Sequence, residues 1–540
     1  MHFALLINLV EKLLVSLLAK LSNFIPEAGI WLNTQRPEWN DANNALVGSG
    51  VSMVTLCYIR RFVSFFHNVV DELDHEEIVI SKEVVDLLGS ISGTFHKHEK
   101  ALSGAIDNQL RRQITDELGL AGEAYRNKVY AGFSEATSPV TATDLDTFFN
   151  RVRAFVDHSI RANQREDKLY HSYNLMKVEK DGGISVRYLY EMLEGQVAVL
   201  SSGYLSANDS LEVLKALRGS ALYREDQHSY ILYPNRQLPR FEAKNQIPPK
   251  GIQGSALLSA MVKGNDRRVV EKDAAGQYHF NGTFQNRKKL IAMLESIGAE
   301  EYPGLVAKER DYILDLYEEI FDHQSFTGRS GTFFGYEGLG SIYWHMVSKL
   351  VLASFENAVE AIEQGMDPDL AKELVERYYD IRAGIGNHKG PENYGAFPFE
   401  AYSHTPGNAG AQQPGMTGQV KEDILARLGE LGLSVKDGLI RFQPNILQAN
   451  EFLEVETNFA YLAVDGSEQS VTVPANSLAF TYCQVPVLYH LTGGSGIKVY
   501  IEGQESPEEI SGNTLYEPWS TSILGRTETV RRIEVQVALN

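Results

Sequence analysis

The stretch from Ser341 to Gly384 gives the first indication of the fold: SIYWHMVSKLVLASFENAVEAIEQGMDPDLAKELVERYYDIRAG. Apolar residues recur at three- and four-residue spacing on both sides of Asp367-Pro368, which supply an N-cap and a first-turn proline for a second helix. We therefore expect helices over 341–365 and 367–384, with Gly384 as the C-terminal cap. Antiparallel helix pairs of this kind indicate a solenoid or a closed toroid, and because no fixed-period repeat is present, we favour the toroid.

The same helical pattern runs from the N-terminus to about residue 440 and then changes. Beyond this point apolar residues alternate along the chain, as Ile533 and Val535 do, and glycine-containing turns separate the runs. Alternation of this kind is typical of strands with one buried face. We therefore predict a mainly α domain over 1–445, followed by an antiparallel β-sandwich over 446–540.

The composition is that of a globular protein. Of the 540 residues, 43% are apolar, which is enough for a sizeable core and excludes a disordered or fibrous chain. The 70 acidic side chains exceed the 50 basic ones, giving a net charge of −20, and the basic pairs are scattered, as at Arg60-Arg61 and Arg111-Arg112. Binding to a nucleic-acid backbone needs clustered Lys and Arg, so we expect no nucleic-acid partner.

The cysteines and the N-terminal stretch bear on location. Cys57 and Cys483 have no metal-ligand spacing, so we expect neither a metal site nor a disulfide framework, and a reducing cytoplasm fits best. The apolar N-terminal run is split by Glu11-Lys12 and is followed by no small-residue cleavage site, which favours a buried helix over a signal peptide. No later stretch reaches the ~18 to 20 consecutive apolar residues of a membrane span, so we expect no membrane association.

Three clusters of residues carry candidate chemistry, and the first lies near the N-terminus. Trp31, Arg36, Trp39, Asn40 and Asp41 combine aromatic faces, an amide and a carboxyl group. Carbohydrate sites use such groups to stack on the sugar ring, to bond its hydroxyls and to protonate the glycosidic oxygen. The alternative is that Asp41 simply caps the helix that follows it.

The second and third clusters each precede a helix. A glycine-rich loop over 328–340 contains Arg329 and leads into the helix of His345, while Thr417-Gly418, preceded by Gln413, opens a later helix. A glycine loop at a helix start can hold an anion through backbone N–H groups and the helix dipole. The alternatives are a hydrogen-bonded core histidine for His345 and a simple N-cap for Thr417.

Together the three clusters indicate more than each does separately. A phosphorolytic sugar enzyme requires one proton donor and a site for a small anion, because phosphate attacks the anomeric carbon while the acid protonates the leaving oxygen. Phosphate is already a nucleophile, so the reaction needs no general base.

The order of these motifs resembles that of the inverting glycoside phosphorylases of the cellobiose and chitobiose phosphorylase type. The resemblance implies an (α/α)6 toroid followed by a C-terminal β-domain. It gives the role of general acid to Asp41, of sugar stacking to Trp39, and of phosphate binding to His345, Thr417 and Gly418. From the chemistry of the clusters themselves, we add Trp31, Arg36 and Asn40 as substrate-binding residues, and from loop position and donor chemistry Arg329 and Gln413 beside the phosphate.

The chain also differs from that family in two ways. The stretch after the acid motif is longer than in the disaccharide phosphorylases, which implies a long insertion within about 60–325, as in a larger β-glucan phosphorylase. Within it, segment 220–285 is rich in Pro, Tyr and Asn and is expected to form an inserted loop region or lid. The family has a β-sandwich and several toroid helices before the acid, so we expect a toroid that is incomplete at its N-terminus and a chain that corresponds to the C-terminal portion.

The leading hypothesis is therefore phosphorolysis of a β-linked glucoside, a disaccharide or an oligosaccharide, with inversion to an α-sugar 1-phosphate. Inorganic phosphate is the co-substrate, and we expect no cofactor. An inverting hydrolase on the same toroid would need a second carboxylate, for which Glu337 and Glu400 are candidates. The other alternative is a non-catalytic carbohydrate-binding module or inactive fragment, completed by a missing N-terminal portion; a homodimer is also compatible with the sequence.

Overall fold

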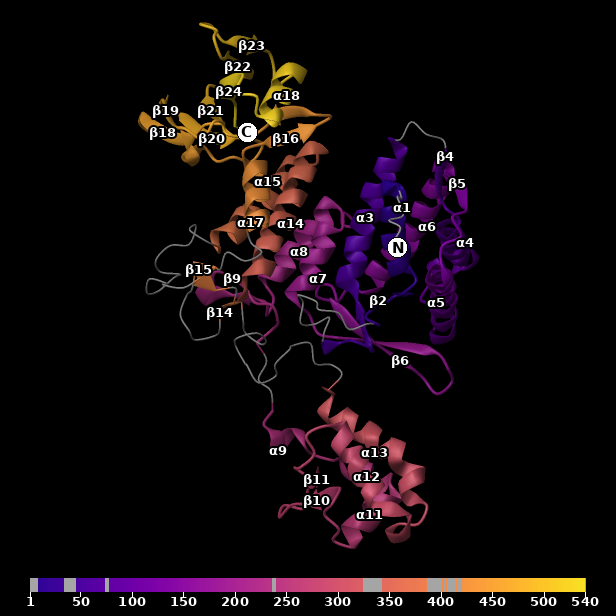
Figure 1. Cartoon of the computed structure of the whole chain (residues 1–540). Coiled ribbons are helices and arrows are strands. Elements are labelled where there is room, and N and C mark those ends of the chain that lie inside the picture. Colours follow the sequence, from indigo (N-terminus) through magenta and orange to yellow (C-terminus); the bar gives the residue numbers. More distant parts are fainter. Residues whose placement is uncertain are drawn as a thin grey trace. The chain divides into compact units, whose positions relative to one another are not determined.

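The computed structural model of the chain falls into two compact units. Unit 1 comprises Met1–Gly195 and Tyr233–Ser341, and unit 2 comprises Gln196–Leu232 and Ile342–Asn540 (Figure 1). The structure describes residues 8–33, 45–72, 77–235, 239–323, 342–385, 401–402, 404–405, 413–414 and 420–539.

Unit 1 begins with a group of amphipathic helices. The N-terminal helix α1 is capped by the Asn8 side chain and buries four leucines, from Leu14 to Leu21, which confirms the expected buried helix. Phe24, Phe95 and Phe155 form an aromatic core between the helices, with ring centroids 4.7 to 6.5 Å apart. The helices of this group are α1 (Leu9–Leu21), α3 (Met53–Asp71), α4 (Lys82–Lys97), α5 (Asn108–Ala131) and α6 (Ala142–Ala162).

A five-stranded antiparallel sheet lies beside these helices in unit 1. Its order is β1-β2-β3-β6-β7, so β3 joins the N-terminal hairpin to strands that follow much later in the chain. Ile25, Ala28, Val51 and Ile184 pack together on this sheet. The strands are β1 (Phe24–Ile25), β2 (Gly29–Trp31), β3 (Gly50–Ser52), β6 (Tyr173–Val178) and β7 (Ile184–Tyr188); β4 (Glu77–Ser81) and β5 (Thr137–Thr141) form a separate pair.

A second part of unit 1 has a hydrophobic core of its own, which extends from Ile247 to Tyr317. The expectation of a loop region over 220–285 is wrong, because the turn-forming residues there start and end short regular elements, whereas the lid stays a prediction. Pro249, for example, occupies the first turn of a helix. The elements of this part are α9 (Phe241–Lys244), α10 (Pro249–Gln253), α11 (Ala256–Lys263), β10 (Val270–Lys272), β11 (Tyr278–Phe280), α12 (Arg287–Glu301) and α13 (Leu305–Phe321).

The helix pair expected around Asp367 is confirmed in unit 2. Helices α14 (Trp344–Glu363) and α15 (Pro368–Ala383) pack together, and the Asp367 carboxylate accepts hydrogen bonds from two N–H groups of α15. Gly384 is the C-terminal cap of α15, and a Cβ there would collide with the carbonyl oxygen of His228. Helix α14 starts later than expected because β12 (Ile342–Tyr343) pairs with β14 (His404–Thr405).

Other short elements complete the helical part of unit 2. Tyr223 and Tyr230 pair across a small hairpin, with their rings 5.3 Å apart, and helix α17 packs against α14. The elements are α7 (Leu193–Ser201, which begins in unit 1), α8 (Ala207–Arg218), β8 (Tyr223–Arg224), β9 (Ser229–Tyr230), β13 (Ala401–Tyr402), β15 (Gln413–Pro414) and α17 (Val420–Glu430).

The C-terminal part of unit 2 is rich in strands, as expected. Ile533, Val535 and Val537 are buried along one strand, which confirms the alternation seen in the sequence. The main sheet has the order β20-β21-β24-β22-β23. The expectation of a purely antiparallel arrangement is wrong, because β24 returns after helix α18 (Glu517–Gly525) and inserts parallel to β21. The strands are β16 (Leu433–Lys436), β17 (Leu439–Phe442), β18 (Thr457–Leu462), β19 (Glu468–Val473), β20 (Ser477–Tyr482), β21 (Val485–Leu491), β22 (Gly496–Ile501), β23 (Glu508–Ile510) and β24 (Val530–Val537).

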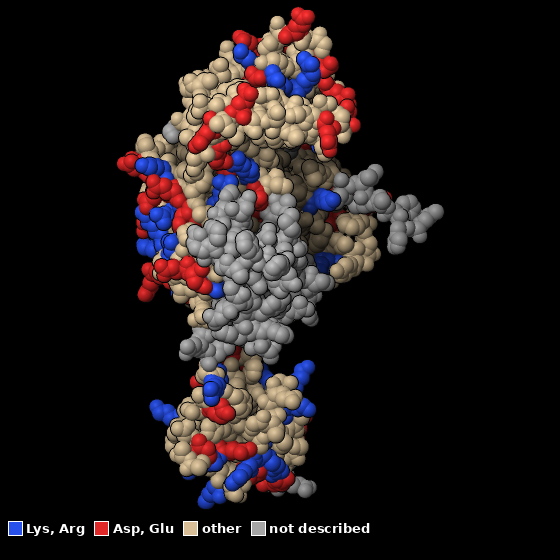
Figure 2. All heavy atoms as spheres, turned by 90° about the vertical axis from the view of Figure 1, so that its left-hand side faces the viewer, with Lys and Arg blue, Asp and Glu red and all other residues tan. Residues whose placement is uncertain are grey.

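The structure thus combines a mainly helical part with a sheet-rich C-terminal region, and the closed toroid stays a prediction. On the face shown in Figure 2, acidic and basic side chains of the described residues are interspersed. In the part of the chain that the structure describes, no helix has both the length and the apolar character of a membrane span.

Candidate functional site

The predicted site residues fall on different parts of the structure. Trp31 belongs to β2 in unit 1, and His345 belongs to α14 in unit 2. Gln413 lies in β15, whose backbone pairs in parallel with β13. The remaining predicted residues lie outside the described part of the chain: Arg36, Trp39, Asn40, Asp41, Arg329, Thr417 and Gly418, together with Glu337 and Glu400 of the hydrolase alternative.

The two ends of the chain segment that carries Asp41 are held together by hydrogen bonds. The backbone N–H of Leu32 donates to the Gly50 carbonyl at 2.9 Å, and the N–H of Gly48 donates to the Leu32 carbonyl at 2.8 Å. The indole N–H of Trp31 donates to the Gly48 carbonyl at 2.9 Å. Strands β2 and β3 and these hydrogen bonds therefore fix the distance between Leu32 and Gly48, which lie on either side of residues 34–44.

Trp31 is half-buried, and its surroundings are polar on one side. Its ring packs against the apolar residues of the sheet. It also lines a surface hollow of about 440 Å³ in unit 1, together with residues of α5. Since the indole N–H is already bonded to Gly48, the ring can offer a ligand only its apolar face. The polar side chains that line the same hollow are Asn23, Asn33, Arg112, Asp116, Glu123 and Arg126.

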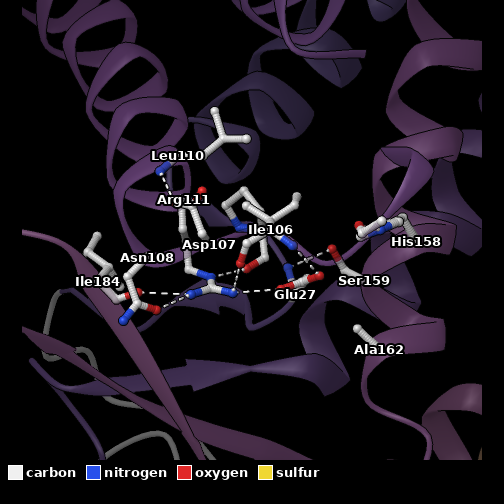
Figure 3. A network of polar contacts seen from close by, with 12 residues as sticks. Glu27, Ile106, Asp107, Asn108, Leu110, Arg111, His158, Ser159, Ala162 and Ile184 are labelled. Carbon is white, nitrogen blue, oxygen red and sulfur yellow. Dashed lines mark hydrogen bonds and ion pairs between the residues drawn. The ribbon is translucent and has the colours of Figure 1, made fainter. Parts of the chain in front are cut away.

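A buried ion pair supports the turn that precedes Trp31. Glu27 adopts a left-handed conformation between β1 and β2, with φ 61°, and its carboxylate lies 2.6 Å from Arg111 Nη2 (Figure 3). The other carboxylate oxygen of Glu27 accepts a hydrogen bond from the N–H of Ile106 at 2.9 Å. Both side chains are almost fully buried.

All of the donors of the Arg111 guanidinium are used. Beyond Glu27, they bond the carbonyl oxygens of Pro26, Ile106 and Ile184 at 2.7 to 2.9 Å and the Asn108 side chain at 3.0 Å. A guanidinium has five N–H groups, so none remains for a ligand. The pair is therefore structural, and Glu27 is not a candidate for the catalytic acid.

Two asparagines extend this network into the sheet. Asn163 donates to the Glu27 carbonyl at 2.8 Å, and Asn174 donates to the Ala28 carbonyl at 2.9 Å and to Asn163 Oδ1 at 2.7 Å. Ser159 Oγ accepts a hydrogen bond from the N–H of Glu27 at 3.0 Å. The turn that leads to Trp31 is thus fixed from α5, α6 and β6.

His345 lies in the first turn of α14, where it is buried. Its ring lies nearly parallel to that of Tyr343, with centroids 5.7 Å apart. Burial lowers the pKa of His345 to about 4, and the charges of Lys349 and Lys421 act in the same direction. The imidazole is therefore neutral at pH 7, and the positive charge near it comes from Lys349 and Lys421.

The two lysines come from different helices of unit 2. Lys349 lies one turn after His345 on α14, and among the described ion pairs it has no carboxylate partner. Lys421 lies in the first turn of α17, with its Nζ 3.8 Å from Glu422 Oε1 and a side chain that is 69% exposed. The two lysines thus lie near the starts of two packed helices, α14 and α17, and both lower the pKa of His345.

The comparisons with known proteins bear on the class of protein. Residues 238–324 match a family model described as GH149 phosphorylase insertion domain 2. This range covers the part of unit 1 that has its own core. The match supports a glycoside phosphorylase, and hence a carbohydrate-active enzyme, without pointing specifically to the cellobiose and chitobiose phosphorylase type. No curated protein matches the chain.

Sequence reasoning did not single out Glu27, Lys349 or Lys421. Glu27 and Arg111 are 84 residues apart, so no local pattern connects them. Lys349 follows His345 by four residues, a spacing that places both on one face of a helix, and this signal was available in the sequence.

Proposed function

We propose that the chain acts in the phosphorolysis of a β-linked glucoside, with inversion to an α-sugar 1-phosphate. The observation that carries this proposal is the burial of His345 in the first turn of α14, with Lys349 one turn later on the same helix. The match to a phosphorylase insertion domain supports the same class of reaction. The (α/α)6 toroid and the domain limits at 445 and 446 belong to this proposal.

In the proposed reaction, a phosphate oxygen attacks the anomeric carbon from the face opposite the leaving oxygen. The bond between that carbon and the glycosidic oxygen breaks, and the Asp41 carboxyl group transfers its proton to the departing oxygen. Configuration at the anomeric carbon is inverted, so a β-linkage gives an α-phosphate. Phosphate brings its own negative charge and nucleophilic oxygen, so neither a second carboxylate nor a cofactor is needed.

His345 and the lysines have different tasks in this scheme. The lysines supply positive charge that attracts phosphate and stabilises it during the attack. The neutral imidazole donates one hydrogen bond to a phosphate oxygen and adds no charge. Thr417, Gly418, Arg329 and Gln413 are proposed to complete the phosphate site.

The substrate side of the proposal rests on the region around β2. Asp41 belongs to the segment between Leu32 and Gly48, whose backbone groups are joined by a hydrogen bond. Trp31 offers an aromatic face but no free indole N–H, so its role is stacking rather than hydrogen bonding. Trp39, Arg36 and Asn40 are proposed to bind the sugar as well.

The test is incubation of the full chain with β-linked gluco-oligosaccharides of defined linkage, with and without inorganic phosphate. We expect release of an α-sugar 1-phosphate that depends on phosphate, with the anomer identified by NMR. Release of free sugar in the absence of phosphate would instead support the hydrolase alternative. If no turnover occurs in either direction and Asp41→Asn leaves sugar binding unchanged, the chain is a binding module and the proposal is wrong.

A further inference from the structure

Helices α3 and α6 bring together three side chains that can ligate a metal ion. His67 and Asp71 lie one turn apart on α3, and Asp146 lies on α6. His67 Nε2 lies 2.7 Å from Asp146 Oδ1 and 3.8 Å from Asp71 Oδ2. One ligand atom from each side chain lies within 4.8 Å of the other two.

The inner two ligands are already held in position. The side chain of His67 is 13% exposed, and its ring lies against Phe149 with the centroids 5.8 Å apart. Asn150 Nδ2 donates to Asp146 Oδ1 at 3.1 Å, which orients that carboxylate. Asp71 is 61% exposed, so an ion can reach the cluster from solvent. Orientation of ligands by neighbouring groups is typical of metal sites in proteins.

The charges of the cluster are not balanced by lysine or arginine. Elsewhere on the same two helices, Arg60 on α3 pairs with Asp157 on α6 at 3.0 Å, which is an ordinary ion pair. In contrast, Asp71 and Asp146 have no Lys or Arg partner among the described ion pairs, and both face one imidazole. A divalent cation would balance the two carboxylates.

We propose that His67, Asp71 and Asp146 bind a divalent transition-metal cation of the Zn²⁺ type. His67 Nε2 and one oxygen of each carboxylate would be the ligands, and water would complete the coordination. Zinc binds such atoms at about 2.0–2.2 Å, which places tetrahedral ligand atoms about 3.4 Å apart. The 2.7 Å separation has to open by about 0.7 Å and the 3.8 Å separation has to close by about 0.4 Å to reach this spacing.

The donor set also selects among cations. Mg²⁺ and Ca²⁺ prefer oxygen ligands only, whereas an imidazole nitrogen with two carboxylates suits Zn²⁺ and its neighbours in the first transition row. The ion would crosslink α3 and α6, and α3 begins directly after β3. The role is thus stabilisation of unit 1, which is separate from the proposed phosphorolysis.

The experiment uses the full chain after treatment with a chelator and dialysis. Isothermal titration with Zn²⁺ should show a site of one ion per chain, and Zn²⁺ should raise Tm by about 2–5 °C because it binds the folded state. His67→Gln and Asp71→Asn should each weaken this site at least about tenfold. Asp71 is exposed, so its variant should fold even if the His67 variant does not.

The control is His96→Gln. His96 is 66% exposed and lies 3.6 Å from one carboxylate, that of Glu99, so its replacement should leave the Zn²⁺ titration unchanged. Mg²⁺ should give no shift in Tm. The proposal is overturned if the parent protein binds no Zn²⁺ saturably, or if Asp71→Asn and His67→Gln bind it as the parent does.

Discussion

Two basic regions of the molecule differ in their burial and in how their charge is balanced. In unit 1, Arg111 is paired with the Glu27 carboxylate, and each of its N–H groups has an acceptor within the protein. In unit 2, the buried His345 is kept neutral, and Lys349 nearby has no carboxylate partner among the described ion pairs. A balanced buried charge fixes the chain, whereas the half-buried Lys349 and the exposed Lys421 can meet an anion from solution.

The difference follows from the cost of burying charge. A buried ion that loses its partner destabilises a protein strongly, so a fully bonded pair such as Glu27 and Arg111 resists change. Burial lowers the pKa of His345, the charges of the nearby lysines lower it further, and those charges favour any anion that binds there. The first region supports the segment that bears the proposed acid, and the second is proposed to hold phosphate. The predictions below test this division of roles.

The largest effect is expected at the proposed acid. Asp41→Asn removes the proton donor while keeping the size of the side chain, so kcat for phosphorolysis should fall by about 10²- to 10⁴-fold. The thermal unfolding curve should not change. Asp86→Asn is the control, because Asp86 is a solvent-accessible carboxylate on α4 that pairs with Lys82 and Lys128. Equal losses in both variants would remove Asp41 from its role.

The next effect concerns stability. Arg111→Met leaves the Glu27 carboxylate buried without its partner, and should lower the free energy of unfolding by about 3–5 kcal/mol. The neighbouring Arg112 forms an exposed pair with Asp116, so Arg112→Met should cost at most about 1 kcal/mol. Chemical denaturation measures both. Similar losses of unfolding free energy in the two variants would show that the buried network around Arg111 stabilises the fold no more than the exposed pair does.

A smaller effect concerns pH. The pKa of His345 is lowered from 6.5 to about 4 in the folded protein. Between pH 4 and 6.5 the imidazole is therefore protonated more readily in the unfolded chain than in the folded protein. Stability from this group is therefore present above pH 6.5 and is lost as the pH falls towards 4. Relative to His345→Gln, the parent should lose up to about 3 kcal/mol over this range. Parallel stability curves for the two proteins would contradict the lowered pKa.

The smallest effect concerns phosphate affinity. Lys349→Met removes one positive charge near the proposed phosphate site, so KM for phosphate should rise about tenfold, as expected for the loss of one charge contact. Stability should stay the same or rise slightly, because Lys349 has no ion-pair partner to lose among the described residues. Lys436→Met is the control, because Lys436 is an exposed residue at the end of β16. An unchanged KM for phosphate in Lys349→Met would place the phosphate elsewhere.

Local features of the fold were predictable from the sequence. The cap at Asp367, the proline after it and the spacing of apolar residues predicted α14 and α15 closely. The change to strands was predicted at about residue 440, close to Asp437 and Gly438, which form the tight turn of a hairpin and both have positive φ. These signals depend on residues that are neighbours in the chain.

Features that depend on distant residues were not predictable in the same way. The pairing of Ile342 with Thr405 shortened α14 at its start, and the parallel insertion of β24 beside β21 follows no local pattern. The contact between His67 and Asp146 joins positions 79 residues apart. For the candidate site, the sequence indicated His345, but only the fold brings Lys421 of another helix close to it.

The central claim is that phosphate binds beside His345. The most direct test is NMR of histidine-labelled protein, with the His345 signal assigned through His345→Gln and titrated with pH in the absence and presence of phosphate. A bound phosphate brings negative charge next to the imidazole, so the pKa of His345 should rise from about 4 towards its ordinary range, and Lys349→Met should require more phosphate for the same rise. An unchanged pKa of His345 at phosphate concentrations that saturate turnover would contradict the claim.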